Sequence, residues 1–215
     1  MHYITTDAFE PRKTPLQARS TVTVEAIHEA TIQVLLSEGV KRTTTTRVAK
    51  RAGVSVGTLY QYYSNKQSLL FAVLEAKLNK TSEAMEIACK RAHGKPIAEI
   101  AKDAVEAYVD AKMQSADVSA ALYRISAEFG GPELMKRLNQ RSQKALEAAL
   151  RTAPDATQRR DSFAIQMVLA AMAGTTRSVL EAGGSPAMFK NLRHHLVVLC
   201  QSYLVAIAQP AFEKK

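Results

Sequence analysis

Residues 43–70 read TTTTRVAKRAGVSVGTLYQYYSNKQSLL, with four threonines before a basic segment and three tyrosines within four residues. Threonine is a poor residue for a helix interior but a good N-cap, so we expect a helix to begin within residues 43–46 and to end near Ala52. Gly53-Val54-Ser55 forms a short turn, and a second short helix is expected over residues 56–63. Two short helices joined by a glycine-containing turn predict a helix-turn-helix motif.

The packing of this motif follows from the positions of its apolar and small residues. Leu59 and Tyr63 are assigned to the core, and Ala49 and Gly53 permit the close crossing of the two helices. A recognition helix reads the edges of DNA bases with its N-terminal residues, while the preceding helix lies across the DNA backbone. The residues expected to project outward from the second helix are Val56, Gly57, Thr58, Gln61 and Tyr62.

The segment before the motif is expected to contain an arm and a helix. Residues 1–20 mix prolines and charges without periodicity, so we interpret them as a flexible basic arm. Apolar residues at helical spacing predict a helix that begins near Thr23 and ends at Gly39, a glycine in C-terminal position. The cations of the arm are Arg12, Lys13 and Arg19.

Helical patterns also fill the segment after the motif. Ser64 and Gln67 have the spacing of a capping box and predict a long amphipathic helix that reaches about Arg91. Further helices are expected over residues 97–114, 117–129, 132–152, 158–182 and 186–208, between glycine- and proline-containing breaks. No stretch alternates like a strand, so the predicted fold class is all-α with about nine helices.

The chain is basic, with 29 Lys and Arg against 20 Asp and Glu, a formal charge of +9. Residues 1–80 hold 11 of the cations and 6 of the acids, so more than half of the excess lies in the first third. This balance favours a polyanionic partner, either nucleic acid or an acidic membrane surface.

Cys89 and Cys200 fit no metal spacing and are expected to be free thiols, with a redox role as the alternative. Without a signal peptide or an uninterrupted apolar span, the protein is expected to be cytoplasmic.

Residues 24–74 resemble the DNA-binding domain of the TetR family of bacterial transcriptional regulators. The specific features are AGVSVGTLYQY over residues 52–62 and the following Asn65-Lys66. The resemblance implies a helix-turn-helix domain over residues 21–66 and a helical domain for effector binding and dimerisation over residues 67–215. The chain length and the all-helical remainder are compatible with it.

The resemblance also implies where DNA is touched. Thr46 and Arg47 match a pair that contacts the backbone and sometimes a base, and Lys66 matches a phosphate clamp at a helix start. Because Val56 and Gly57 have no side-chain hydrogen-bonding groups, specificity would come from the other residues, from contact with a thymine methyl and from DNA shape. The full set of expected DNA contacts is Thr45, Thr46, Arg47, Val56, Gly57, Thr58, Tyr60, Gln61, Tyr62 and Lys66.

Several of these residues also fit a purely structural role. Thr43 and Thr44 are sufficiently explained as a helix cap, and Tyr60 fits either the core or a DNA contact. The cations of the arm fit either a solvated tail or a contact with the minor groove of DNA.

In the family, the final pair of helices forms a four-helix bundle with its copy in a twofold dimer. Here the helices expected over 158–182 and 186–208 are the most apolar, and small residues such as Ala170 and Gly174 permit close approach. Twofold symmetry would place two recognition helices about one DNA turn apart, which implies a palindromic operator. The alternative is that both helices are internal core.

The family usually has an effector pocket among its middle helices. Methionine and aromatic residues at helical spacing fit such a pocket or simple core packing. The candidate lining residues are Tyr108, Met113, Leu122, Tyr123, Ile125, Phe129, Phe163 and Met167.

Together these features predict a ligand-responsive DNA-binding regulator without cofactor, metal or membrane partner. The most direct form is a homodimeric repressor that a small molecule releases from its operator. The alternative is a DNA-binding adaptor or architectural protein that uses the same motif without an effector. An enzyme is not expected, because the sequence has no glycine-rich phosphate loop, zinc-ligand spacing or nucleophile elbow.

Overall fold

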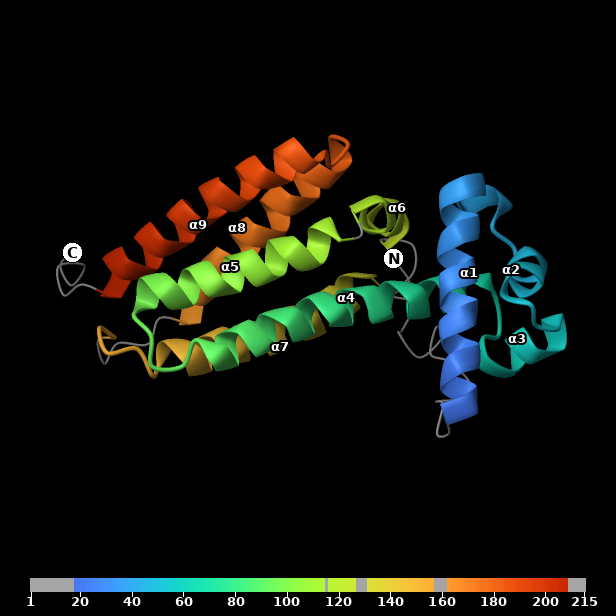
Figure 1. Ribbon diagram of the computed structural model, residues 1–215, viewed down its shortest axis with the longest axis horizontal. Coiled ribbons are helices and arrows are strands. Elements are labelled where there is room, and N and C mark those ends of the chain that lie inside the picture. Colours follow the sequence, from blue (N-terminus) through green and yellow to red (C-terminus); the bar gives the residue numbers. More distant parts are fainter. Residues whose placement is uncertain (1–17, 115, 127–130, 157–161, 209–215) are drawn as a thin grey trace, which may run out of the picture. The chain divides into compact units, whose positions relative to one another are not determined.

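The computed structural model describes residues 18–114, 116–126, 131–156 and 162–208, and within them every regular element is an α-helix (Figure 1). The described helices are α1 (Ala18–Arg42), α2 (Thr45–Ala52), α3 (Val56–Tyr62), α4 (Lys66–Arg91), α5 (Ile97–Met113), α6 (Ala116–Ser126), α7 (Gly131–Leu150), α8 (Ser162–Glu181) and α9 (Pro186–Ala208). The all-α prediction with about nine helices is therefore confirmed over the described ranges.

The chain forms two compact units. The first, which we call the head, comprises Met1–Lys77 and Asp117–Met135. The second, which we call the body, comprises Leu78–Ala116 and Lys136–Lys215. Helices α4, α6 and α7 contribute residues to both units, with only Ala116 of α6 in the body. Helices α1, α2 and α3 belong to the head, and α5, α8 and α9 belong to the body.

The first helix begins earlier than predicted. It starts at Ala18 and not near Thr23, so Arg19, expected in the arm, lies in its first turn. Arg12 and Lys13 lie outside the described residues. Gly39 interrupts the helix as predicted, with φ 76° and ψ 169°, a conformation that glycine adopts at little cost. Thr43 closes this end, because its amide and its hydroxyl both donate to the Gly39 carbonyl, at 3.1 Å and 2.9 Å.

The head core is formed where α1 meets α2 and where α2 meets α3 (Figure 1). Ile27, Val34 and Leu35 are buried on α1 at the spacing of one helix face. Val48 of α2 and Leu59 of α3 are completely buried in the same core. The core is small, so the motif keeps most of its polar residues at the surface.

The N-terminus of α4 differs from the predicted capping box by one residue. The Asn65 side chain accepts a hydrogen bond from the Ser68 amide at 2.8 Å, and the Ser68 hydroxyl accepts one from the Asn65 amide at 3.2 Å. This reciprocal pair satisfies two amides at the helix start. The predicted pair of Ser64 and Gln67 is therefore wrong, although the helix starts and ends where the sequence indicated.

The body is organised around α9, which packs against α5 and α8 (Figure 1). Phe189 of α9 is fully buried, and burying a side chain of this size contributes about 1.5–3 kcal/mol. Gln201 of α9 donates to the Ala98 carbonyl of α5 at 2.8 Å, and Arg193 of α9 forms an ion pair with Asp110 of α5. The connection between α8 and α9 turns at Gly184, with φ 56°, where an added Cβ would lie 3.3 Å from the Phe189 ring.

Candidate nucleic-acid interface

The helix-turn-helix of the head is closed by hydrogen bonds at both ends of α2. Thr44 is the N-cap, since its hydroxyl accepts the Arg47 amide at 3.3 Å. At the other end Gly53 is left-handed, with φ 69°. Its amide donates to the Lys50 carbonyl at 3.3 Å, and the Val54 amide donates to Ala49 at 3.0 Å. These two bonds form a Schellman motif, which turns the chain sharply toward α3.

The next helix has its own cap. The Ser55 hydroxyl accepts the Thr58 amide at 2.9 Å and lies 2.8 Å from the Thr58 hydroxyl. This cap holds Thr58, one of the predicted DNA contacts, in a fixed position on the first turn of α3. Val56 and Thr58 are half-buried and Gly57 and Gln61 are exposed. The tip of α3 is therefore accessible, as a recognition helix requires.

The three tyrosines do not divide as the sequence analysis expected. Tyr63 is buried as predicted, but Tyr62 is also buried, with 8% of its surface exposed, so its outward projection is wrong. The physical reason is helical spacing: Tyr62 and Tyr63 lie three and four residues after the buried Leu59 and share its face. Tyr60 is the tyrosine that faces solvent, with 42% of its surface exposed. A contact between Tyr62 and DNA stays a prediction, for which 8% of the residue's surface is accessible.

The exposed Tyr60 joins the two helices of the motif. Its hydroxyl lies 3.1 Å from the Thr45 hydroxyl, in a hydrogen bond at the surface. Thr45 is half-buried and the neighbouring Thr46 is exposed. Two predicted contact residues from different helices thus form one polar site, at which either hydroxyl has hydrogen-bonding capacity to spare.

Two predicted DNA-contacting cations already have partners within the head. The Arg47 guanidinium forms an ion pair with Glu38 of α1, and the same nitrogen donates to the Arg42 carbonyl at 3.2 Å. The Lys66 ammonium donates to the Val40 carbonyl. Both cations therefore have partners at the end of α1 that the sequence did not indicate.

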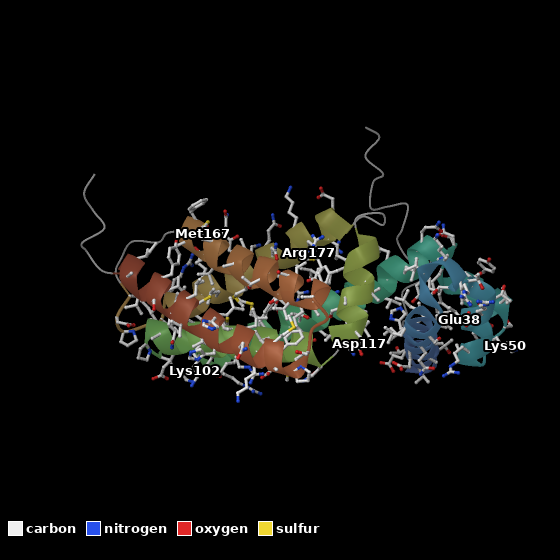
Figure 2. All side chains as sticks on the ribbon, turned by 90° about the horizontal axis from the view of Figure 1, so that it is seen from above. Glu38, Lys50, Lys102, Asp117, Met167 and Arg177 are labelled. Carbon is white, nitrogen blue, oxygen red and sulfur yellow. The ribbon has the colours of Figure 1, made fainter. Side chains whose placement is uncertain are left out.

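Further cations on this surface were missed by the sequence analysis. Lys50 (labelled in Figure 2) and Arg51 are exposed on α2. The Arg51 side chain donates to Gln33 of α1 at 2.6 Å. Lys41 and Arg42 are exposed just before α2. The signal that could have found them is the basic run KRTTTTRVAKR over residues 41–51, which contains no acidic residue. Such a run supplies the sequence-independent attraction to phosphates.

The predicted effector-pocket residues are distributed over both units. Leu122 is buried and Tyr123 half-buried in the head, whereas Tyr108 is half-buried and Met113 exposed in the body. Phe163 and Met167 lie on the surface of α8, with 66% and 47% of their area exposed. The Met167 side chain points away from the body (Figure 2). Phe129 lies outside the described residues, as does the side chain of Ile125.

The body contains a buried cation that the sequence analysis did not single out. Lys112 of α5 is only 3% exposed, and its ammonium lies 5.7 Å from the centre of the Tyr108 ring, one helical turn earlier. A buried ammonium is costly to desolvate, and aromatic faces attract cations. The candidate residue Tyr108 therefore lies beside a positive charge.

The outer surfaces of α8 and α9 are unusually apolar. Val198 and Leu199 are exposed on α9, as Phe163 and Met167 are on α8. Among the described helices, only α8 is long and apolar enough to cross a membrane by length and composition, and 39% of its apolar window is buried within the chain. We call the exposed residues Phe163, Met167, Val198 and Leu199 the outer apolar face.

Both cysteines are buried free thiols. Burial raises the pKa of Cys89 to about 12, with smaller contributions from Glu86 and Asp103, and raises the pKa of Cys200 to about 11. Since the thiolate is the reactive form, neither thiol is poised for redox chemistry. Within the described residues, no group of three or more His, Cys, Asp and Glu side chains is arranged to hold a metal ion.

Comparison with known sequences connects both parts of the chain to one family. Residues 27–73 match the family described as bacterial regulatory proteins, tetR family. Residues 96–204 match the family described as tetracyclin repressor-like, C-terminal domain. The fatty acid metabolism regulator protein of Bacillus subtilis (strain 168) is 33% identical over 60 residues, which is 28% of this chain and 31% of that protein. The match thus spans about a third of the relative's length.

Solved structures share the fold. The fatty acid degradation regulator FadR of Bacillus halodurans superposes with a TM-score of 0.66 at 18% identity, over 86% of this chain and 96% of its own. A Mesorhizobium loti MAFF303099 protein assigned to the TetR family gives 0.71 at 14% identity, over 88% and 98% of the two chains. At these identities the likeness concerns the fold alone. The chain thus matches the family's N-terminal and C-terminal domains, and it has the capped helix-turn-helix and helical body described above. This protein therefore belongs to the TetR family of transcriptional regulators.

Proposed function

We propose that the protein is a homodimeric repressor that binds a palindromic operator and is released from it by a small molecule. The observation that carries this proposal is the capped helix-turn-helix with an accessible tip and a basic surface. The exposed Gln61 and Gly57 lie on α3, and the exposed Lys50 and Arg51 lie on α2. This arrangement supports base reading from α3 and phosphate contacts from α2.

Within this proposal the DNA contacts are revised from the sequence prediction. Tyr60 and Thr45, hydrogen-bonded at the surface, replace Tyr62 as the hydroxyl groups offered to phosphate or base. Arg47 supplies the guanidinium for a guanine, and its Nε and Nη2 atoms remain outside its two contacts with Glu38 and the Arg42 carbonyl. Thr46, Val56, Thr58 and Lys66 complete the proposed surface.

The outer apolar face supports dimerisation through α8 and α9. Four large apolar side chains are exposed on these two adjacent helices, and covering them with a second copy of the chain would remove apolar surface from water and stabilise the dimer. A twofold dimer would present two α3 helices to two half-sites, so the operator would be palindromic. The alternative of the two helices as wholly internal core is disfavoured by the same exposed residues.

The proposed effector binds the body beside Tyr108 and Lys112. The buried ammonium of Lys112 would attract a negatively charged group, and burial would strengthen that attraction. The relatives named as fatty acid regulators suggest acyl compounds, whose carboxylate or phosphate group meets this requirement. We therefore propose an anionic molecule with an apolar chain, acting on a soluble protein in the cytoplasm.

The test is a gel-shift titration with the DNA upstream of the protein's own gene, at moderate salt. The expected result is a shifted band that a long-chain fatty acid or its coenzyme A ester abolishes. Arg47→Ala is expected to weaken this band more than it weakens binding to unrelated DNA. If the protein shifts none of the upstream DNA fragments tested, the proposal is overturned. If it shifts the DNA but no ligand changes the shift, the result favours a DNA-binding adaptor.

A further inference from the structure

An acidic residue lies within the basic surface of the head, in contact with its central arginine. Glu38 (labelled in Figure 2) precedes the break at Gly39 in α1. It pairs with Arg47, which is in the first turn of α2. The two side chains are 35% and 48% exposed, so water screens the pair and it contributes little to folding. The location of this pair on the proposed DNA-binding surface therefore calls for another explanation.

The contacts of Arg47 restrict the guanidinium in two ways. One nitrogen, Nη1, donates both to the Glu38 carboxylate and to the Arg42 carbonyl, at 3.2 Å for the latter. With this nitrogen held from one side, the planar guanidinium directs Nε and Nη2 along a fixed direction. Bidentate recognition of guanine needs two donors in such a fixed plane, and an arginine held in advance loses less entropy on binding.

The charge of Glu38 acts differently on different DNA sequences. The first turn of α2 has no acidic residue of its own, and its amides and dipole favour a phosphate. A carboxylate beside that turn repels the phosphates of every duplex. On a duplex with a guanine within reach of Arg47, the hydrogen bonds from the ordered guanidinium offset this repulsion. On a duplex without that guanine, the repulsion is not offset by this contact.

From these contacts we infer that Glu38 is a positioning residue that raises the discrimination between operator and unrelated DNA. It does so by holding the Arg47 guanidinium and by weakening sequence-independent attraction to phosphates. This inference rests on the proposed DNA-binding function, and it adds a residue that touches neither base nor phosphate. In the sequence, Glu38 is the only acidic residue between residues 30 and 74.

The experiment compares Glu38→Gln with the full-length wild-type protein on two duplexes. One is the sequence that the wild-type protein enriches from a random pool, and the other is a scrambled duplex of equal composition. Removing one charge close to the phosphates is expected to raise affinity for the scrambled duplex about two- to fivefold. Affinity for the enriched duplex is expected to rise less or to fall, so the ratio of the two affinities decreases. Glu25→Gln, which removes the charge of another exposed α1 residue, is the matched control and is expected to leave the ratio unchanged.

Two further measurements separate positioning from charge alone. In an Arg47→Ala background, Glu38→Gln is expected to leave the affinity ratio unchanged, because the group it positions is absent. In the DNA-free protein, the Nε–Hε resonance of Arg47 is expected to move in Glu38→Gln and to stay in place in Glu25→Gln.

The outcomes distinguish the inference from the proposed function. A wild-type protein that enriches no sequence overturns the proposed function and this inference with it. A wild-type protein that enriches a sequence, with equal ratios in Glu38→Gln and Glu25→Gln, overturns the inference alone. An Nε–Hε resonance of Arg47 that does not move in Glu38→Gln also overturns the inference.

Discussion

The Nε2 atom of His28 and the hydroxyl oxygen of Tyr63 lie 2.7 Å apart and join α1 to the C-cap residue of α3. Tyr63 is 2% exposed, so its hydroxyl has little access to water. We expect Tyr63→Phe to lower the free energy of unfolding by about 1 kcal/mol, because His28 loses a partner in a partly buried site. Urea unfolding of the full chain checks this. Tyr60→Phe is the control, because its hydroxyl bonds Thr45 at the surface; an equal loss in both variants would contradict the role given to His28.

The cap of α4 gives a second prediction, which contrasts two adjacent residues. Asn65→Ala is expected to lower the free energy of unfolding by about 1 kcal/mol, since the Ser68 amide loses its acceptor. Ser64→Ala is expected to cost less, because the Ser64 hydroxyl makes only a 3.4 Å contact with the Ser68 hydroxyl. Thermal unfolding of both variants shows which one loses more stability. A larger loss of stability in Ser64→Ala than in Asn65→Ala would favour Ser64 as the N-cap, as the sequence predicted.

The difference between these caps shows what local sequence signals determine. Breaks at glycine and proline and the helical spacing of apolar residues predicted every described helix, because these signals act within a few residues. Ser64 and Asn65 are both good N-caps, so the sequence alone could not choose between them. Helix existence was therefore predictable, while the atom that closes the helix was not.

The candidate site was predictable in outline for a similar reason. Two glycine-linked helices identify the motif, but α3 has only seven residues, too few for a clear buried face. The spacing of Tyr62 from Leu59 is present in the sequence, but the sequence does not show that the packing of α3 on α2 buries Tyr62 and leaves Tyr60 exposed. The Glu38–Arg47 pair crosses the break at Gly39, so no helical spacing relates its members. For Phe163 and Met167, the sequence pattern is the same for a residue that lines a pocket and for one that a second copy of the chain would cover.

The buried thiols predict both chemical inertness and sensitivity to alkali. With the pKa of Cys89 raised to about 12 and that of Cys200 to about 11, a disulfide reagent at pH 8 is expected to label neither until the protein unfolds. An unfolded thiol ionises near pH 8.5, so the unfolded state releases protons first as pH rises. The stability from keeping both thiols neutral is complete below that pH and is lost between it and pH 11–12.

Unfolding by urea at several pH values checks this alkaline dependence. Cys89→Ala combined with Cys200→Ala is expected to show a shallower decline above pH 8.5, even if its stability is lower throughout. Burial also raises the pKa of Tyr63, which adds to the decline above about pH 10 in both proteins. Rapid labelling of the native wild-type protein at pH 8 would contradict the buried position of the thiols.

The outer apolar face predicts that a single charge prevents association. Met167→Glu is expected to raise the dissociation constant of the proposed dimer roughly 100-fold or more, because a carboxylate between two apolar surfaces must be desolvated without a partner. Sedimentation over a range of protein concentrations measures this change. Ile87→Glu is the matched control: Ile87 is a similarly exposed apolar residue of the body, at 42% against 47% for Met167, but it lies on α4, outside the outer apolar face. If association survived in Met167→Glu and in Val198→Glu, another surface would have to join the two copies. If Ile87→Glu dissociated the dimer as well, the effect would come from added charge and not from the position of α8.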